Sequence, residues 1–320
     1  MRPVIFLLNR LRRLHRAVLV AAGAVLLIAA PVRADVPAVV VSIKPIHSLV
    51  AAVMAGVGTP DLIVDGKVSL HEYRLKPTDT DRINKARLVF WVGPMLETFL
   101  KPPLVDATPP AEVVQLSEAP GIRLLETRQS GGWGAGPDAR GMLPTGFATD
   151  GHLWLDPLNA QRIVASAATH LAAADPEHAS RYTRNAAELY RRLDALDAAL
   201  RPKLAALASR PFLVYQDAYQ YFERRYGLTA VGAITADPAE PPTAARLDRI
   251  RLRIRTSGVR CVFGEPQTPA DVLKSVVAGS KARTGTLDPE GLSLEPGPDL
   301  YFTLITDLGD GLVKCLSVRD

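Results

Sequence analysis

The chain has 320 residues, of which 38 are Lys or Arg and 33 are Asp or Glu, giving a formal net charge of +5. The excess comes from the first 34 residues, which contain six Arg and no acidic residue; without them, 32 basic residues face 33 acidic ones. The body of the protein is therefore nearly neutral, and its charge gives no support for nucleic-acid binding.

Residues 1–34 have the pattern of a secretory signal. Five Arg precede an apolar run over residues 17–32, and the segment ends in Val32-Arg33-Ala34, with small residues at the −3 and −1 positions of a cleavage site. A transmembrane anchor is the alternative, but this run is shorter than the roughly 20 residues that cross a bilayer. No cysteine lies near the cut, so a lipid anchor is not supported. We expect export to the periplasm and removal of residues 1–34.

The length and the cysteine count of the mature chain constrain its fold. About 286 residues are more than one hydrophobic core usually covers, which favours two lobes. Cys261 and Cys315 are predicted to form one disulfide, because exported proteins oxidise paired cysteines; two buried free thiols are the alternative. The count excludes a CxxC redox pair and a cysteine metal cluster.

The first half alternates strands and helices. Strands are predicted at 38–43, 62–64, 88–92 and 113–116, and helices at 45–53, from Pro77 onward, and from about 95 to Leu100. This alternation is typical of a parallel α/β sheet. Residues 126–151 are rich in Gly and Pro and have no periodicity, so they are predicted to form a mobile loop. The N-terminal lobe is assigned to residues 35–177.

The second half opens with a long helix. Its apolar residues recur at steps of three and four, as expected for one buried stripe: Tyr182, Ala186, Leu189, Leu193, Leu196, Leu200 and Leu204. We assign residues 178–207 to a connecting helix and 208–320 to a C-terminal lobe. That lobe is predicted to contain strands at 212–215, 230–234, 261–263 and 301–305 and helices at 218–226, 242–257 and 269–280. The predicted fold is α/β, with two (β/α)4-type lobes of parallel strands joined by one long rigid helix.

Several polar residues follow predicted strands, where open parallel sheets bind ligands. They are His71 and His152 in the first lobe and Gln216, Asp217, Glu265 and Asp288 in the second. Two imidazoles and a carboxylate are a possible zinc set, since zinc accepts nitrogen and oxygen ligands. Their spacing alone is weak evidence, because the sequence has no H-x₃-H pair and no HExxH helix, and scattered surface histidines remain the alternative.

A more specific indication comes from six segments in order along the chain. They are 41–50 (VSIKPIHSLV), 70–79 (LHEYRLKPTD), 90–94 (FWVGP), 152–157 (HLWLDP), 261–267 (CVFGEPQ) and 285–289 (GTLDP). With Cys315, they resemble the ZnuA-type zinc receptors, which are periplasmic solute-binding proteins (cluster A-I) of metal-importing ABC transporters. The resemblance covers nearly all of residues 38–318 and implies the same two-lobed fold, with a metal site between the lobes.

The resemblance also implies a ligand set. It assigns metal binding to His71, His152 and Asp288, and places Gln216 where family members have a histidine or a carboxylate. A neutral amide oxygen is a poorer zinc donor than imidazole, so either Gln216 binds weakly or indirectly, or the site has changed its ligand or lost affinity. The 126–151 segment contains no histidine, whereas zinc-type members often have a His-rich loop there. Glu265 is predicted to orient a metal ligand through a hydrogen bond without binding the metal itself, as carboxylates commonly fix an imidazole tautomer.

The remaining candidates have simpler interpretations. His47 is predicted to make a local hydrogen bond in the first helix, and Asp217 is a candidate N-cap for the helix that follows it. Trp91 and Trp154 are expected in the core or in the wall of the cleft rather than in a chemical role.

The sequence thus predicts a monomeric periplasmic receptor that is not an enzyme. It would bind a divalent metal, Zn²⁺ in preference to Mn²⁺, pass it to an inner-membrane ABC permease, and bind no nucleic acid. Two alternatives stay open. One is a binding or adhesion module that kept the receptor fold while its metal site changed, which Gln216 favours. The other is a zinc-dependent hydrolase, since two histidines and a carboxylate can leave an open catalytic position.

Overall fold

The computed structural model describes residues 36–66, 68–106, 110–128, 133, 149–235 and 242–318. All of them lie in one compact unit, Val36–Asp320. The predicted signal, residues 1–34, falls outside the described residues, and so does most of the predicted loop at 126–151. None of the described helices combines the length and the apolar character needed to cross a membrane.

The first lobe is built on a four-stranded parallel sheet in the order β2-β1-β3-β4. Its strands are β1 (Val39–Ile43), β2 (Asp61–Val64), β3 (Leu88–Trp91) and β4 (Glu112–Gln115). Every residue of β1 and β3 is buried, which explains why these strands appear in the sequence as unbroken apolar runs. All four strands were predicted.

Three α-helices accompany the first sheet: α2 (Lys44–Val53), α3 (Pro77–Lys85) and α4 (Pro157–Ala174). Each has a proline in its first turn, where the missing N–H costs nothing. The side chain of Asp156 caps α4 by accepting a hydrogen bond from the Leu158 amide. Where a helix was predicted at about 95–100, the chain forms only a short 3-10 turn at Thr98–Leu100.

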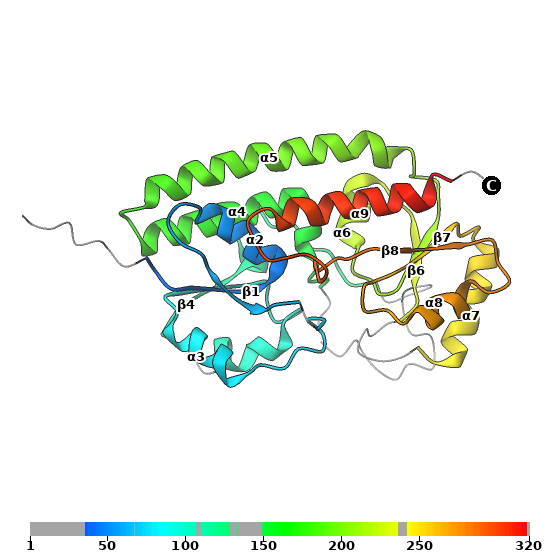
Figure 1. The fold of residues 1–320 in the computed structure, drawn as a ribbon, viewed down its shortest axis with the longest axis horizontal. Helices are drawn as coiled ribbons and strands as arrows, with labels where there is room; N and C mark the ends of the chain where they lie inside the picture. The colour runs from blue at the N-terminus through cyan, green and yellow to red at the C-terminus, as the bar shows by residue number, and fades with distance from the viewer. Residues whose placement is uncertain are drawn as a thin grey trace, which may run out of the picture. The chain divides into compact units, whose positions relative to one another are not determined.

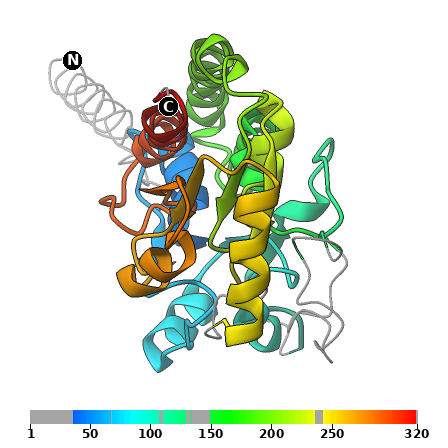
Figure 2. The ribbon, with the colours of Figure 1, turned by 90° about the vertical axis from the view of Figure 1, so that its right-hand side faces the viewer.

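The second lobe repeats this arrangement with the order β6-β5-β7-β8, again parallel. Its strands are β5 (Phe212–Val214), β6 (Ala230–Ala233), β7 (Cys261–Gly264) and β8 (Arg283–Thr286). Its helices are α6 (Gln220–Tyr226), α7 (Ala244–Thr256), α8 (Ala270–Val277) and α9 (Leu300–Leu316). Helices α7 and α8 contact each other beside this sheet (Figure 2).

One strand prediction was wrong. Residues 301–305 belong to α9, and the fourth strand of the lobe is β8, which was not predicted. The apolar residues of 301–305 start a helical stripe that continues through Leu308 and Leu312, both buried. A five-residue apolar run cannot distinguish a strand from the start of such a helix. Strand β8 lies at the edge of the sheet and is only partly buried, so it lacks an apolar run.

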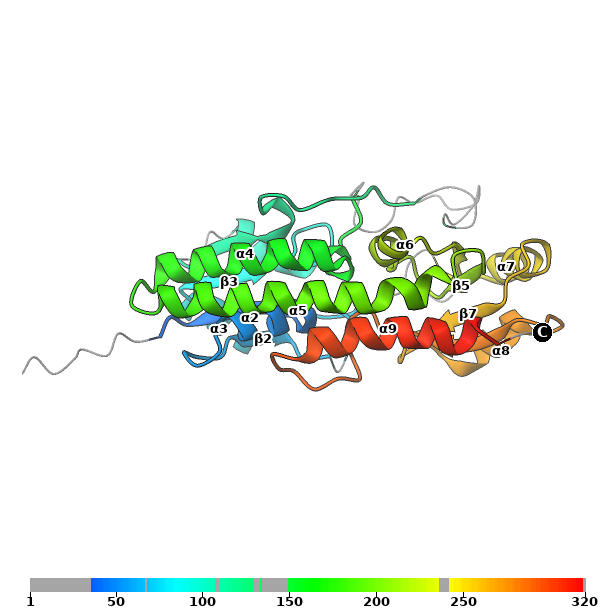
Figure 3. The ribbon, with the colours of Figure 1, turned by 90° about the horizontal axis from the view of Figure 1, so that it is seen from above.

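The connecting helix is α5 (Ala179–Ala205), as predicted from the apolar stripe. It packs against α4 on one side and α9 on the other, and it extends from the first lobe to the second (Figures 1 and 3). One hydrophobic cluster includes β1, α4, α5, β5 and α9 residues, so the core is continuous between the lobes. The lobes are thus joined by shared packing as well as by the chain.

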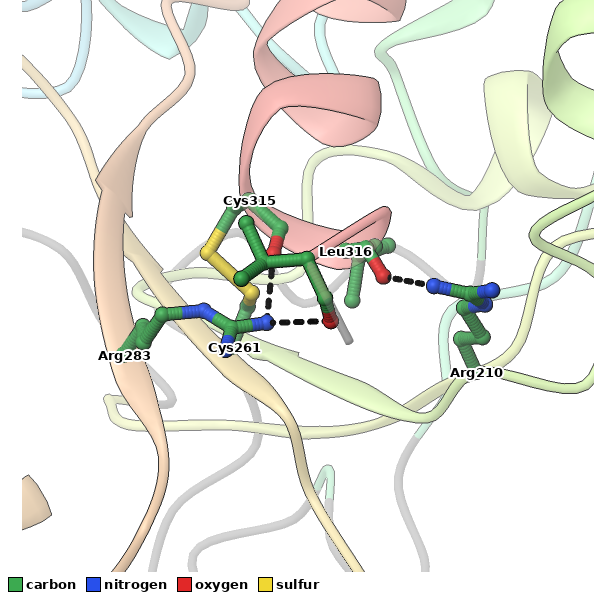
Figure 4. Close-up of a disulfide and its surroundings, with 6 residues drawn as sticks. Arg210, Cys261, Arg283, Cys315 and Leu316 are labelled. Atoms are coloured by element: carbon green, nitrogen blue, oxygen red, sulfur yellow. Dashed lines mark hydrogen bonds between the residues drawn. A yellow bond between two sulfur atoms is a disulfide. The ribbon is translucent and has the colours of Figure 1, made fainter. Parts of the chain in front are cut away.

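The predicted disulfide is confirmed: Cys261 at the start of β7 is bonded to Cys315 in the last turn of α9 (Figure 4). Two arginines stabilise the same end of the helix. Arg283 donates to the carbonyl oxygens of Cys315 and Val318, and Arg210 donates to that of Leu316. The C-terminal helix is therefore fixed to the second sheet covalently and through its terminal carbonyl groups.

Candidate metal centre

His71 and His152 lie side by side although 81 positions separate them in the sequence. His71 is in the loop after β2, and His152 immediately precedes the short 3-10 turn Leu153–Leu155. Their ring centroids are 6.0 Å apart. Two imidazoles that share a zinc ion at about 2.1 Å per bond have ring centres roughly 5–6 Å apart. Within the described residues neither Nε2 atom has a hydrogen-bond partner, although both are buried. Such orphaned nitrogens are suited to a metal.

A carboxylate orients one of these rings. The Nδ1 atom of His152 is 2.8 Å from Oδ1 of Asp150, which also accepts the His152 backbone amide at 3.0 Å. With Nδ1–H donating to the carboxylate, Nε2 carries the lone pair. This is the carboxylate–histidine arrangement that commonly supports a metal-bound imidazole. Sequence reasoning missed Asp150, whose only signal is its position two residues before His152.

The two rings have opposite pKa shifts. Burial, together with the nearby His152, lowers the pKa of His71 to about 3, so this ring is neutral at physiological pH. Burial also acts to lower the pKa of His152, but the hydrogen bond and charge of Asp150, and then the charges of Glu290 and Asp217, raise it overall. A metal ion would therefore bind the neutral His71 ring directly, whereas at His152 it would have to compete with a proton.

Glu290 is a buried carboxylate that faces the first lobe from the second. Its side chain accepts hydrogen bonds from the Ser69 hydroxyl at 3.2 Å and the Leu70 amide at 3.1 Å, directly before His71. The residue is only 5% exposed. Burial raises the pKa of Glu290 to about 7, although the Leu70 bond and the charge of His152 act in the opposite direction. Sequence reasoning missed Glu290, which follows the predicted ligand Asp288 by two positions.

Asp288 makes its hydrogen bonds within its own loop. Oδ1 accepts the Leu292 amide at 3.0 Å, and Oδ2 accepts the Ser293 amide at 3.0 Å and its hydroxyl at 2.8 Å. In the part of the chain that the structure describes, no three His, Cys, Asp or Glu side chains lie close enough to hold a metal ion. The assignment of Asp288 as a ligand stays a prediction.

Gln216 follows β5 and is buried, as is Glu265. Its Nε2 atom donates to Oε2 of Glu265 at 3.2 Å. The same carboxylate accepts hydrogen bonds from the Tyr219 hydroxyl at 3.3 Å and from Gln267 at 2.7 Å. Burial, and next the charge of Glu290, raise the pKa of Glu265 well above its usual value. Glu265 thus contacts the Gln216 amide, and its role in orienting a metal ligand stays a prediction.

Asp217 does not cap a helix, so that interpretation was wrong. The N-cap of α6 is Tyr219, and Asp217 instead pairs with Arg128, whose Nε lies 3.1 and 3.0 Å from its two oxygens. Arg128 also donates to both oxygens of Glu223 at 2.9 Å, and its guanidinium stacks over Trp133. This arginine comes from the first-lobe loop, so it ties that loop to the second lobe directly beside Gln216.

Two simpler predictions are confirmed. His47 in α2 makes a local contact, with Nε2 3.0 Å from the Pro60 carbonyl oxygen. Trp91 and Trp154 are fully buried in the core.

Comparison with known proteins assigns the chain to a family. Residues 39–315 match the model of the family described as zinc-uptake complex component A, periplasmic (ZnuA). The chain belongs to this family. A "High-affinity zinc uptake system protein ZnuA" from Brucella suis biovar 1 (strain 1330) is 42% identical over 305 residues, covering 87% of this chain and 91% of that protein. The protein of the same name from Paracoccus denitrificans (strain Pd 1222) is 32% identical over 319 residues, covering 93% and 97%.

Solved structures support the fold. The periplasmic zinc-binding protein TroA from Treponema pallidum superposes with a TM-score of 0.72 at 22% identity, covering 88% of this chain and 99% of that one. The laminin-binding protein Lmb of Streptococcus agalactiae, described as bifunctional with adhesin and metal-transporting activity, gives 0.72 at 21% identity with the same coverage. At these identities the likeness shows the fold alone, and it confirms the predicted pair of α/β lobes.

The two halves of the candidate centre differ in their chemistry. The first lobe presents two imidazoles whose buried Nε2 atoms have no hydrogen-bond partner among the described residues. The second lobe presents the neutral Gln216 and two buried acids, Glu265 and Glu290. The chemistry of this half is therefore oxygen-based.

Proposed function

We propose that this protein is the periplasmic receptor of a zinc importer, which binds one zinc ion between its lobes and delivers it to an inner-membrane ABC permease. Membership of the ZnuA family supports this function. The structural observation that carries it is the pair of buried Nε2 atoms of His71 and His152, which have no hydrogen-bond partner in the part of the chain that the structure describes. Leaving two such atoms unsatisfied is costly unless a ligand completes them.

His71 and His152 supply the nitrogen ligands in this proposal, and Asp150 holds His152 in the required tautomer. The second lobe supplies a carboxylate, for which the sequence predicts Asp288, and Gln216 contributes at most a neutral oxygen. Zn²⁺ is favoured over Mn²⁺ because imidazole suits zinc, whereas manganese prefers oxygen ligands. The role is binding and transfer, with no catalytic step.

The wider assignments follow from export. We infer that residues 1–34 are removed as a signal peptide and that the protein acts as a periplasmic monomer without nucleic-acid partners. Residues 35–177 form the N-terminal lobe, 178–207 the connecting helix and 208–320 the C-terminal lobe. The receptor would meet the permease after both lobes have contributed ligands to the ion.

One alternative has a specific observation in its favour. An adhesion module with an altered metal site would explain why Gln216 stands where a histidine or carboxylate is expected. No comparable observation favours a hydrolase.

Titration of the purified mature protein with zinc, in competition with a chromophoric chelator, tests the proposal. We expect one saturable site with a Kd below about 1 μM. His71→Ala and His152→Ala should each weaken binding at least about tenfold. His170→Ala is the matched control, because this half-buried histidine pairs with Glu112 and should leave the affinity unchanged. If the wild-type protein has no saturable site at micromolar zinc, the adhesion alternative is favoured.

A further inference from the structure

A helix of the second lobe supports the first-lobe residues around His152. Helix α6 contacts the 3-10 turn Leu153–Leu155, which follows His152 directly. Side chains of α6 also bind two first-lobe segments, one around Leu125 and one around Asp150. Those two segments pair with each other through an isolated antiparallel bridge. The immediate surroundings of this histidine are therefore built from both lobes.

Tyr221 of α6 makes the central contact. Its hydroxyl donates to the Asp150 carbonyl oxygen at 2.8 Å and accepts a hydrogen bond from the Leu125 amide at 3.0 Å. The Asp150 amide in turn donates to the Leu125 carbonyl oxygen at 2.8 Å. These three hydrogen bonds close a ring, and Tyr221 is only 2% exposed. Because buried polar groups that lose their partners are costly, the ring fixes the main chain at Asp150.

The side chain of Asp150 carries this fixed position to the imidazole. Its Oδ1 accepts a hydrogen bond from the His152 backbone amide at 3.0 Å and lies 2.8 Å from Nδ1 of the ring. Its Oδ2 accepts a hydrogen bond at 3.3 Å from Gln220, the first residue of α6. Helix α6 thus holds both the main chain and the carboxylate of Asp150, while the carboxylate holds His152.

An ion cluster fastens α6 to the same part of the first lobe. Arg128 donates to both oxygens of Glu223 at 2.9 Å and pairs with Asp217, which precedes the helix. Glu223 is only 5% exposed, so salt screens this contact little. Since Arg128 follows Leu125 by three positions, the pairing keeps the Leu125 amide within reach of the Tyr221 hydroxyl.

We propose that Tyr221 and Gln220 are positioning residues for zinc binding, which act on His152 through Asp150. This inference rests on the proposed function, in which His152 supplies a nitrogen ligand. Neither residue touches the ion. They hold Asp150 so that its carboxylate keeps the proton on Nδ1 of His152 and leaves Nε2 open to the metal. The zinc affinity of a first-lobe imidazole then depends on a helix of the second lobe.

Zinc affinities of matched Tyr→Phe variants test this role. Tyr221→Phe removes one buried hydroxyl and keeps the ring, and it should weaken zinc binding at least about fivefold, since partners of a bound imidazole typically contribute 10- to 100-fold. Tyr182→Phe removes a buried hydroxyl near the start of α5, one that donates to Asp175 at 2.7 Å, and should leave the affinity unchanged. An unchanged affinity in Tyr221→Phe, or an equal loss in both variants, would overturn the proposal.

Gln220→Ala tests the same role without removing a buried group from the core. It deletes the donor to Oδ2 of Asp150 from a half-buried position and should weaken zinc binding at least about threefold. Gln161→Ala is its control, because it deletes an amide donor to a different carboxylate, that of Asp194, and should have no effect. If Tyr221→Phe fails to fold, a Gln220→Ala protein that binds zinc like the wild type is enough to reject the inference.

A double-mutant cycle shows whether Tyr221 acts through Asp150. Asp150→Asn should weaken zinc binding about 10- to 100-fold. Adding Tyr221→Phe to it should cost less than about twofold more, because the carboxylate through which the hydroxyl acts is already gone. Losses that multiply in the double variant would mean that Tyr221 affects the protein independently of Asp150, against the proposal.

The tautomer of His152 gives a readout that needs no zinc. In nitrogen-15 NMR spectra of the metal-free protein at alkaline pH, the proton should be on Nδ1 in the wild type and shared between the two nitrogens in Tyr221→Phe and Gln220→Ala. The wild-type tautomer in both variants would contradict the inference. A wild-type protein that binds no zinc would refute the proposed function itself, whereas normal wild-type binding with unaffected variants refutes only this inference.

Discussion

Replacing Gln216 with histidine should tighten zinc binding. The position is 3% exposed, at the carboxyl end of β5, and its side chain already contacts a carboxylate, Oε2 of Glu265 at 3.2 Å. An imidazole there could donate one N–H to Glu265 and present its other nitrogen to the metal. Glu265 would then acquire the orienting role that it lacks opposite an amide.

The size of the effect follows from this geometry. Gln216→His exchanges a neutral amide oxygen for a stronger nitrogen donor and adds an orienting carboxylate, a type of partner whose removal typically costs 10- to 100-fold in metal affinity. We therefore expect zinc to bind about 10- to 100-fold more tightly, or about 1.4–2.8 kcal/mol.

Competition titrations at pH 7.5 against a chelator of known affinity would measure this change. The matched control is Gln267→His, which introduces an imidazole beside the same carboxylate, since Gln267 donates to Oε2 of Glu265 at 2.7 Å, but from an exposed position. The control should leave the affinity within about threefold of the wild type. An unchanged affinity in Gln216→His would mean that residue 216 does not face the ion. An equal gain in both variants would mean that the added imidazole acts outside the site.

Two further predictions concern stability. Reducing the disulfide between Cys261 and Cys315, which are 54 positions apart, should lower the free energy of unfolding by about 4 kcal/mol on the chain-entropy model. Urea unfolding with and without reductant measures this loss, and a loss below about 1 kcal/mol would contradict the prediction. Burial raises the pKa of Glu97 from 4.5 to about 7, so the contribution of its protonated form to stability is complete below pH 4.5 and is lost as the pH rises through 7. Glu97→Gln should therefore remove roughly 2–3 kcal/mol of the pH dependence of the unfolding free energy between pH 5 and pH 8. Parallel profiles of unfolding free energy against pH for the variant and the wild type would refute this.

Much of the fold could be predicted because its signals are local. The buried strands of the first sheet are unbroken apolar runs, and α5 carries a stripe at helical spacing. The wrong strand prediction and the missed strand in the second lobe arose where the apolar pattern is short or absent. The run at 301–305 is too short to reveal its period, and β8 is an edge strand of mixed polarity. Only the packing of α9 against α5 and the pairing of β8 with β7 decide these two segments.

The candidate site was predictable only in part, because its members depend on loop conformation. His71 and His152 were identified from their motifs, and the structure brings their rings together. Asp150 and Glu290 were missed since nothing in their own sequence context shows which side chain they face. Asp288 illustrates the converse: its motif is clear, but its oxygens are used by the loop that carries it.

The contacts between the lobes bear on how the receptor selects its metal. The backbone amide of Tyr301, in α9, donates to the Ser48 hydroxyl of α2 at 2.9 Å, and the Tyr301 hydroxyl donates to the Trp154 carbonyl oxygen at 2.8 Å. Arg225 of α6 binds Asp197 of α5 at 2.8 and 2.7 Å. Together with the continuous core, these contacts oppose a large rotation of one lobe against the other, because rotation would break several buried hydrogen bonds at once. Discrimination between metals would then depend on the proposed donor atoms, two imidazole nitrogens and a carboxylate, rather than on how far the lobes close.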